Sequence, residues 1–142
     1  MQTLGWKEWG ALPELGIDRI HMKVDTGAKT SCLHAFKLVP FERDGEAWLR
    51  VYLHPQQDSK QEHQFDVPVY EQRQVTDSGG HSEMRYVIRS RLVLGSFNEI
   101  IELTLTNRDT MKFRMLLGRQ AMRHHFTVNP AAAHLLGEFP CE

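Results

Sequence analysis

The residues best suited to chemistry lie in one short segment, residues 20–31, with the sequence IHMKVDTGAKTS. The apolar strand predicted at its start ends at Asp25, which is followed by Thr26 and Gly27. A carboxylate at a strand end is suited to acid–base chemistry when it lies beside a hydroxyl and a glycine that permits close backbone approach. Asp and Gly are also common turn formers, so these three residues taken alone are compatible with an ordinary turn.

A second informative segment, residues 113–122, combines an apolar run with the pair Gly118-Arg119 and the start of a short predicted helix. The guanidinium group of Arg119 presents several donors in a fixed fork, so it can brace a neighbouring loop through carbonyls or a carboxylate. Between the two segments, Gly79 and Gly80 lie in a polar stretch. This pair is typical either of a tight turn or of the moving tip of a hairpin.

The elements that must position these residues are predicted to be mainly antiparallel β-strands. Apolar and polar residues alternate with period two, as in strands with one buried face, over residues 48–53, 64–69, 84–94 and 97–106. Gly95-Ser96 predicts a two-residue hairpin turn, and a strand over residues 6–15 should end at Pro13. Helical spacing is confined to residues 119–125, with composition for one further turn at 131–136. The predicted fold class is therefore all-β with one or two short helices.

In the order and spacing of these motifs the chain resembles the retropepsins, the dimeric aspartic proteases of retroviral type. The shared features are Asp-Thr-Gly-Ala at residues 25–28, a glycine-bearing hairpin at residues 75–83, and an apolar strand followed by Gly118-Arg119. A closer resemblance is to a bacterial retropepsin-like family known as ATP-dependent zinc proteases, often linked to RimK-type ATP-grasp glutamate ligases. It covers nearly the whole chain through GWKEW at residues 5–9, the run 23–34, SGGHSEMR at 78–85, MLLGR at 115–119 and VNP at 128–130.

This resemblance implies a closed, retropepsin-like β-barrel formed as one domain by residues 1–142. It also implies a homodimer, because one Asp-Thr-Gly supplies one carboxylate and aspartic proteolysis needs two that share a proton. Asp25, Thr26 and Gly27 would form the catalytic loop, with Thr26 bonded across the twofold axis. The substrate would be an extended peptide or protein segment, bound by loop, hairpin and late-arginine residues: Ala28, Lys29, Ser78, Gly79, Gly80, His81 and Arg119.

Lys29 departs from the retroviral pattern, which places an acidic residue there to pair with the late arginine. Arg119 therefore needs another partner. Together with Arg85, Arg89 and Arg91, Lys29 could form a basic lining that favours glutamate-rich peptides, such as the tails made by a glutamate ligase. The other interpretation is a solvated strand face, because exposed charges often contribute little.

The composition sets further bounds on function. Among 142 residues, 17 Lys and Arg balance 18 Asp and Glu, which argues against a nucleic-acid-binding protein. No apolar run approaches the roughly 18 residues of a membrane span, and the N-terminus does not have the pattern of a secretory signal. Cys32 and Cys141 cannot form a disulfide framework, so a cytoplasmic protein that does not act on membranes is expected.

No metal ion or other cofactor is expected. The chain has no His-Glu-x-x-His motif, and its eight histidines are scattered. His124 and His125 would diverge by about 100° on a helix, so metal-dependent hydrolysis ranks last. Two hypotheses remain. The chain is either a peptidase or a catalytically weak relative that binds and regulates a RimK-type ligase or its glutamylated target, and Asp25 and the hairpin would serve either role.

Overall fold

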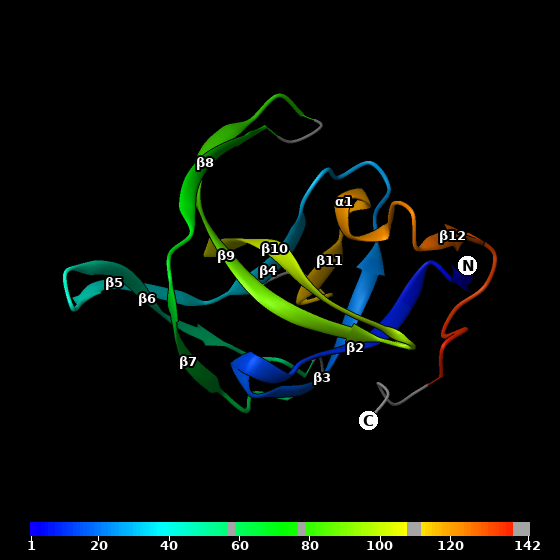
Figure 1. Cartoon of the computed structure of the whole chain (residues 1–142), viewed down its shortest axis with the longest axis horizontal. Coiled ribbons are helices and arrows are strands. Elements are labelled where there is room, and N and C mark those ends of the chain that lie inside the picture. Colours follow the sequence, from blue (N-terminus) through cyan, green and yellow to red (C-terminus); the bar gives the residue numbers. More distant parts are fainter. Residues whose placement is uncertain (57–58, 77–78, 108–111, 138–142) are drawn as a thin grey trace.

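The computed structural model describes residues 1–56, 59–76, 79–107 and 112–137 (Figure 1). Its elements in chain order are β1 (Gln2–Leu4), β2 (Lys7–Leu12), the 3-10 turn η1 (Pro13–Leu15), β3 (Ile17–Val24), β4 (Ser31–Ala35), β5 (Lys37–Arg43), β6 (Glu46–Leu53), β7 (His63–Pro68), β8 (Glu71–Thr76), β9 (Ser82–Leu94), β10 (Phe97–Asn107), β11 (Met115–Leu117), α1 (Arg119–Met122) and β12 (Phe126–Val128). The predicted all-β class with short helices is confirmed.

Six strands form a closed barrel. Their order is β10–β4–β11–β3–β2–β9, and antiparallel pairing of β9 with β10 closes the ring. Gly95 turns this last hairpin with a φ of 59°, as predicted from the two-residue link. The barrel encloses aliphatic and methionine side chains that alternate along the strands and are almost fully buried: Ile20, Met22, Leu33, Ile88, Leu92, Leu103, Leu105 and Leu117.

The order of the strands places β11 between the two strands that flank the Asp-Thr-Gly segment. β11 pairs in parallel with β3, with Leu117 opposite Val24, and antiparallel with β4. The chain therefore leaves the barrel at the end of β3 and re-enters it at β4, one strand further along the wall. The connecting loop, residues 25–30, spans the end of β11.

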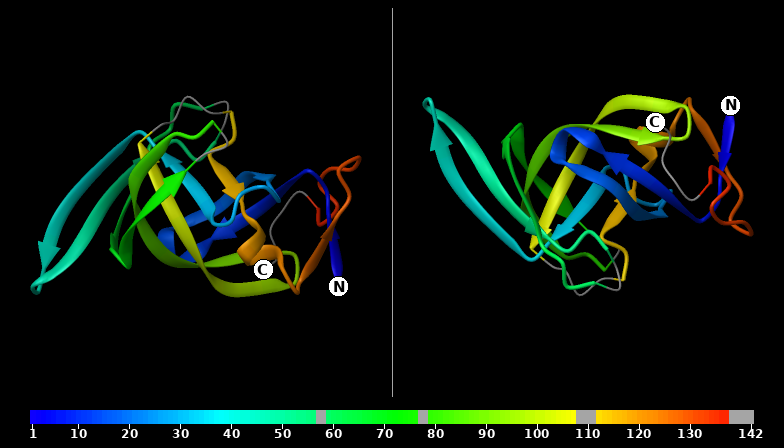
Figure 2. Two further views of the ribbon diagram at one scale, coloured as in Figure 1. Left: turned by 90° about the horizontal axis from the view of Figure 1, so that it is seen from above. Right: turned by 90° about the horizontal axis from the view of Figure 1, so that it is seen from below.

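Two smaller sheets flank the barrel. Strands β5, β6 and β7 form an antiparallel sheet whose β5–β6 hairpin projects from the barrel (Figures 1 and 2). The parallel pair β1–β12 brings the N-terminal strand beside the C-terminal region, with Thr3 and Thr127 side-chain oxygens 2.8 Å apart. The pairing is thus mixed rather than purely antiparallel, because three strand pairs run in parallel.

The helical predictions need correction. The helix expected over residues 119–125 ends at Met122, because His124 adopts a φ of 73° and the chain turns into β12. Residues 131–136 contain turns rather than a helical turn of their own. Pro13 does end β2, but it then starts η1. No helix in the described part of the chain has the length and apolar character to cross a membrane.

Candidate active site

Asp25 lies at the end of β3, in a turn that its own backbone and side chain stabilise. Its N–H donates to the Leu117 carbonyl at 2.9 Å, which anchors the loop to β11. Its Oδ1 accepts from the Gly27 N–H at 3.0 Å, and its carbonyl accepts from the Ala28 N–H at 3.2 Å. The carboxylate is half-buried, while Thr26 and Gly27 are exposed. A carboxylate held in this way is fixed in direction and accessible to a substrate.

Arg119 braces this loop through main-chain oxygens rather than through an acidic partner. Its Nη1 donates to the carbonyls of Thr26 at 3.3 Å and Gly27 at 3.1 Å, and its N–H donates to the Ala28 carbonyl at 2.9 Å. The N–H of the next residue in α1 donates to the Lys29 carbonyl at 3.1 Å. The start of α1 therefore holds four consecutive loop residues, and the presence of Lys29 does not leave Arg119 without a role.

Gly118 permits this close approach. A Cβ atom on Gly118 would lie 2.6 Å from the carbonyl carbon of Thr30 and 2.8 Å from the Ser31 nitrogen. The Gly118 N–H also donates to the buried Ser31 hydroxyl at 3.0 Å. Ser31 was not singled out from the sequence, because a serine after a turn carries no local signal of such a contact. Its hydroxyl links the start of β4 to Gly118, directly after β11.

The predicted glycine-bearing hairpin is formed by β8 and β9, paired in register from Glu71–Val87 to Thr76–Ser82. Thr76 Oγ1 and Ser82 Oγ lie 2.6 Å apart where the strands end. Gly80 has a φ of 82°, and Gly79, Gly80 and His81 are exposed. Ser78 lies outside the described residues. The hairpin rises at the same end of the barrel as the Asp25 loop and α1 (Figure 1).

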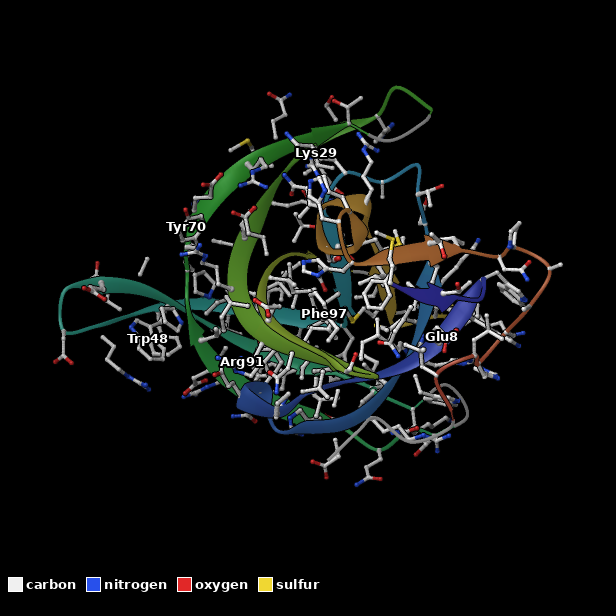
Figure 3. The ribbon with its side chains drawn as sticks, turned by 45° about the vertical axis from the view of Figure 1, so that its right-hand side comes forward. Glu8, Lys29, Trp48, Tyr70, Arg91 and Phe97 are labelled. Atoms are coloured by element: carbon white, nitrogen blue, oxygen red, sulfur yellow. The ribbon has the colours of Figure 1, made fainter. Side chains whose placement is uncertain are left out.

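One of the four basic residues expected near the site lies away from it. Lys29 is exposed on the Asp25 loop. Arg85 is half-buried and pairs with Glu83 at 2.9 Å, and Arg89 stacks on the Tyr70 ring at 4.5 Å. Arg91 instead contacts Asn98 and Glu14 at the opposite end of β9, well away from Lys29 (Figure 3). The expectation is therefore wrong for Arg91, because a thirteen-residue strand carries it to the far end.

A pocket of about 320 Å³ lies beside α1 and the start of β4. Its lining is mixed in charge and polarity: Ser31, Arg89, Phe97, Glu99, Ile100, Ile101, Glu102, Gln120, Ala121 and His125. Sequence reasoning missed this pocket, because its lining comes from β4, β9, β10 and the region of α1. Ser31, which directly follows the Asp25 loop, brings the pocket to the edge of the site, but no residue of the loop itself lines it.

Histidines and the described cysteine are placed in separate environments. Within the described ranges, no three His, Cys, Asp or Glu side chains come together in a way that could hold a metal ion. His34 Nδ1 lies 2.6 Å from Thr106 Oγ1, and the Nε2 atoms of His21 and His134 lie 2.8 Å apart. Cys32 is buried on β4, and burial raises the pKa of its thiol.

Comparison with known proteins gives the same family. The family model described as "Retropepsin-like aspartic endopeptidase RimB" matches residues 3–137. A protein named "Probable alpha-L-glutamate ligase" from Parasynechococcus marenigrum is 50% identical over 95% of this chain and 29% of its own length. A protein of the same name from Shewanella pealeana is 46% identical over 95% of this chain and 30% of its own length. This chain thus spans about three-tenths of the length of these curated relatives.

A solved structure extends the likeness to the fold. A Legionella pneumophila protein of unknown function superposes with a TM-score of 0.76 at 25% identity, covering 95% of this chain and 98% of that one. The family match includes the Asp25 loop, the β8–β9 hairpin and the Gly118-Arg119 pair, which the structure places at one end of the barrel. The chain therefore belongs to the RimB-like family of retropepsin-like aspartic endopeptidases.

Proposed function

We propose that this chain is an aspartic-type endopeptidase that acts as a homodimer through one Asp25 from each subunit. The observation that carries the proposal is the single half-buried Asp25 carboxylate, held at a strand end by Gly27 and by the loop that Arg119 braces. A twofold axis would bring two identical carboxylates together without any further sequence. Residues 1–142 would act as one domain in the cytoplasm.

In this mechanism the two Asp25 carboxyl groups share one proton, because two like charges at close range cannot both ionise readily. The ionised carboxylate accepts a proton from a water molecule, and the protonated one polarises the scissile carbonyl. Thr26, which is exposed beside Asp25, would bond across the axis to the partner's loop. Arg119 keeps both loops in shape through the Thr26 and Gly27 carbonyls.

The proposed substrate is an extended peptide, with glutamate-rich sequences preferred. The β8–β9 hairpin, with Gly79, Gly80 and His81 exposed near its tip, would close over the peptide backbone together with Ser78. Ala28 would contribute backbone, and the exposed Lys29 would attract acidic side chains. Relatives named as probable glutamate ligases support this preference. A glutamate ligase forms peptide bonds to glutamate, and a peptidase could hydrolyse those bonds.

The test compares wild type with Asp25→Asn in digests of a peptide library that includes oligoglutamate, from acid to neutral pH. We expect Asp25→Asn to lose at least about 100-fold in kcat/KM, since proton transfer is removed while the Gly27 hydrogen bond can persist. Sedimentation should give twice 16.5 kDa for both proteins. A strictly monomeric wild type, or an active Asp25→Asn, would contradict the proposal.

A second candidate is a catalytically weak module that binds a RimK-type ATP-grasp ligase or its glutamylated target. It is favoured by the names of the relatives, in which about three-tenths of a probable ligase matches this chain. The discriminating measurement is ligase activity with wild-type or Asp25→Asn protein added. An equal effect of both proteins supports the regulatory module, and an effect that depends on Asp25 supports the peptidase.

A further inference from the structure

Glu8 is a fully buried carboxylate that accepts hydrogen bonds from three main-chain amides. Its Oε2 accepts from the N–H of Gly5 at 2.7 Å and of Leu135 at 2.9 Å, and its Oε1 accepts from Leu136 at 3.2 Å. Amide donors directed at one side chain select an acceptor-only group, which an ionised carboxylate is. Figure 3 shows Glu8 where the blue N-terminal strands meet the orange to red C-terminal segment.

The three bonds join the two ends of the described chain. Gly5 lies in the turn between β1 and β2, while Leu135 and Leu136 lie beyond β12. The same two segments also touch through backbone, because the Trp6 N–H donates to the Ala132 carbonyl at 2.8 Å. A Cβ atom on Gly5 would lie 2.6 Å from the Ala133 Cα, so the turn fits flat against the C-terminal segment.

This joint adjoins the strand that ends at Asp25, because Glu8 lies on β2, which pairs with β3 with Glu8 opposite Met22. The carbonyl of Trp6 accepts from the N–H of Val24 at 2.8 Å, and Val24 is the last residue of β3, directly before Asp25. A second contact lies earlier in β3, where the Nε2 atoms of His21 and His134 are 2.8 Å apart. The C-terminal segment therefore contacts both β3, at His21, and the Glu8 carboxylate on the neighbouring strand.

We infer that Glu8 is a positioning residue for Asp25. Its carboxylate holds the Gly5–Trp6 turn against the C-terminal segment. Through the hydrogen bond between Trp6 and Val24, this turn fixes the end of β3 and therefore the direction in which the Asp25 loop leaves the strand. The catalytic part of this inference rests on the proposed peptidase function, whereas the mechanical coupling from Glu8 to Val24 does not. Glu8 itself lies on β2 and is fully buried, so it would not touch a bound peptide.

The experiment uses Glu8→Gln in the full chain, with Glu14→Gln as the matched control. Glutamine supplies one acceptor and turns an NH₂ group toward main-chain donors, so at least one amide loses its partner. Glu14 is exposed in the 3-10 turn η1, which follows the other end of β2, and it contacts Arg91. Amide hydrogen exchange should rise about tenfold at Val24 relative to Leu103 in the barrel wall, because a local opening is released rather than the whole fold.

Kinetics provide a second measurement. In Glu8→Gln, kcat should fall about tenfold with KM changed less than twofold, because the geometry of the reacting groups is altered and peptide binding is not. Glu8→Asp, which keeps a carboxylate, should have a kcat and a Val24 protection between those of Glu8→Gln and wild type. If Glu8→Gln does not fold, Glu8→Asp is compared with wild type in its place. Glu14→Gln should leave both measurements as in wild type.

The outcomes separate the two proposals. If exchange at Val24 rises no more than at Leu103, Glu8 contributes only to overall stability and the inference is wrong. If Val24 exchange rises selectively while wild type cleaves no peptide, the coupling stands and the peptidase proposal fails. If kcat falls with no selective change at Val24, Glu8 does not act through the strand that carries Asp25.

Discussion

The main-chain N–H of Gly118 donates a hydrogen bond to the buried hydroxyl of Ser31 at 3.0 Å. This contact joins the end of β11 to the start of β4, and it encloses the Asp25 loop between them. A glycine is required here because of space, since its φ of −89° suits any residue. The geometry of the candidate catalytic loop thus depends on a residue without a side chain.

Replacing Gly118 with alanine should destabilise the protein strongly. The new Cβ would lie 2.6 Å from the Thr30 carbonyl carbon, so the backbone of the loop or of β11 must shift. We expect the free energy of unfolding, measured by urea denaturation, to fall by about 3 kcal/mol. Gly45→Ala is the control, because nothing lies within 4 Å of its Cβ position and its φ of 78° costs an alanine about 1–2 kcal/mol. Equal losses in both variants would contradict this account.

Replacing Arg119 with lysine should impair activity more than stability. Lysine keeps the positive charge but not the fork that donates to the Thr26 and Gly27 carbonyls. If the chain is a peptidase, kcat/KM should fall about tenfold, since a small misplacement of the loop is costly to catalysis. The melting temperature should change little, because Arg119 is exposed. The matched control is Arg123→Lys, an exposed arginine just after α1. A similar loss of activity in that variant would contradict a specific role for the hydrogen bonds from Arg119 to the loop.

The Arg50–Asp66 pair should make stability depend on acid pH. Two hydrogen bonds from Arg50, at 2.8 and 3.0 Å, together with its charge and that of Arg43, hold the pKa of Asp66 below its ordinary value of 3.8. Since the folded-state pKa is lowered, the stabilisation is present above the unfolded-state pKa and is lost as the pH falls through the lowered value. Melting temperatures of wild type and Asp66→Asn should differ by a few degrees at pH 7 and converge below pH 3.8. If the two melting temperatures differ as much below pH 3.8 as at pH 7, the Arg50–Asp66 pair does not cause the difference in stability.

The strands that could be predicted are those whose signal is local. Alternation identified β6, β7, β9 and β10, and Gly95 identified their last turn, because period two and turn chemistry are written in neighbouring residues. β4 was not predicted, since all five of its residues are buried and no alternation marks it. The helix after Gly118 was predicted too long, because the positive φ of His124 that ends it depends on where β12 must go.

The residues of the candidate site also divide into those with a local sequence signal and those without one. The Asp25 loop, the glycine hairpin and Arg119 could be recognised because each is a short run with its own residue types. The pocket beside α1, the contact of Ser31 with Gly118 and the joint at Glu8 could not. Arg91 was misplaced because strand parity indicates which face a side chain shares but not how far along a long strand it lies.

The amino-acid sequence alone singled out the candidate site residues and predicted a mainly β chain, because turn preference and side-chain alternation act between near neighbours. Only the tertiary structure decided that Arg119 braces the loop through carbonyls and that Glu8 fastens Leu135. Those contacts join residues 92 and 127 positions apart. Their partners are set by the order in which strands pair around the barrel, which no local pattern encodes.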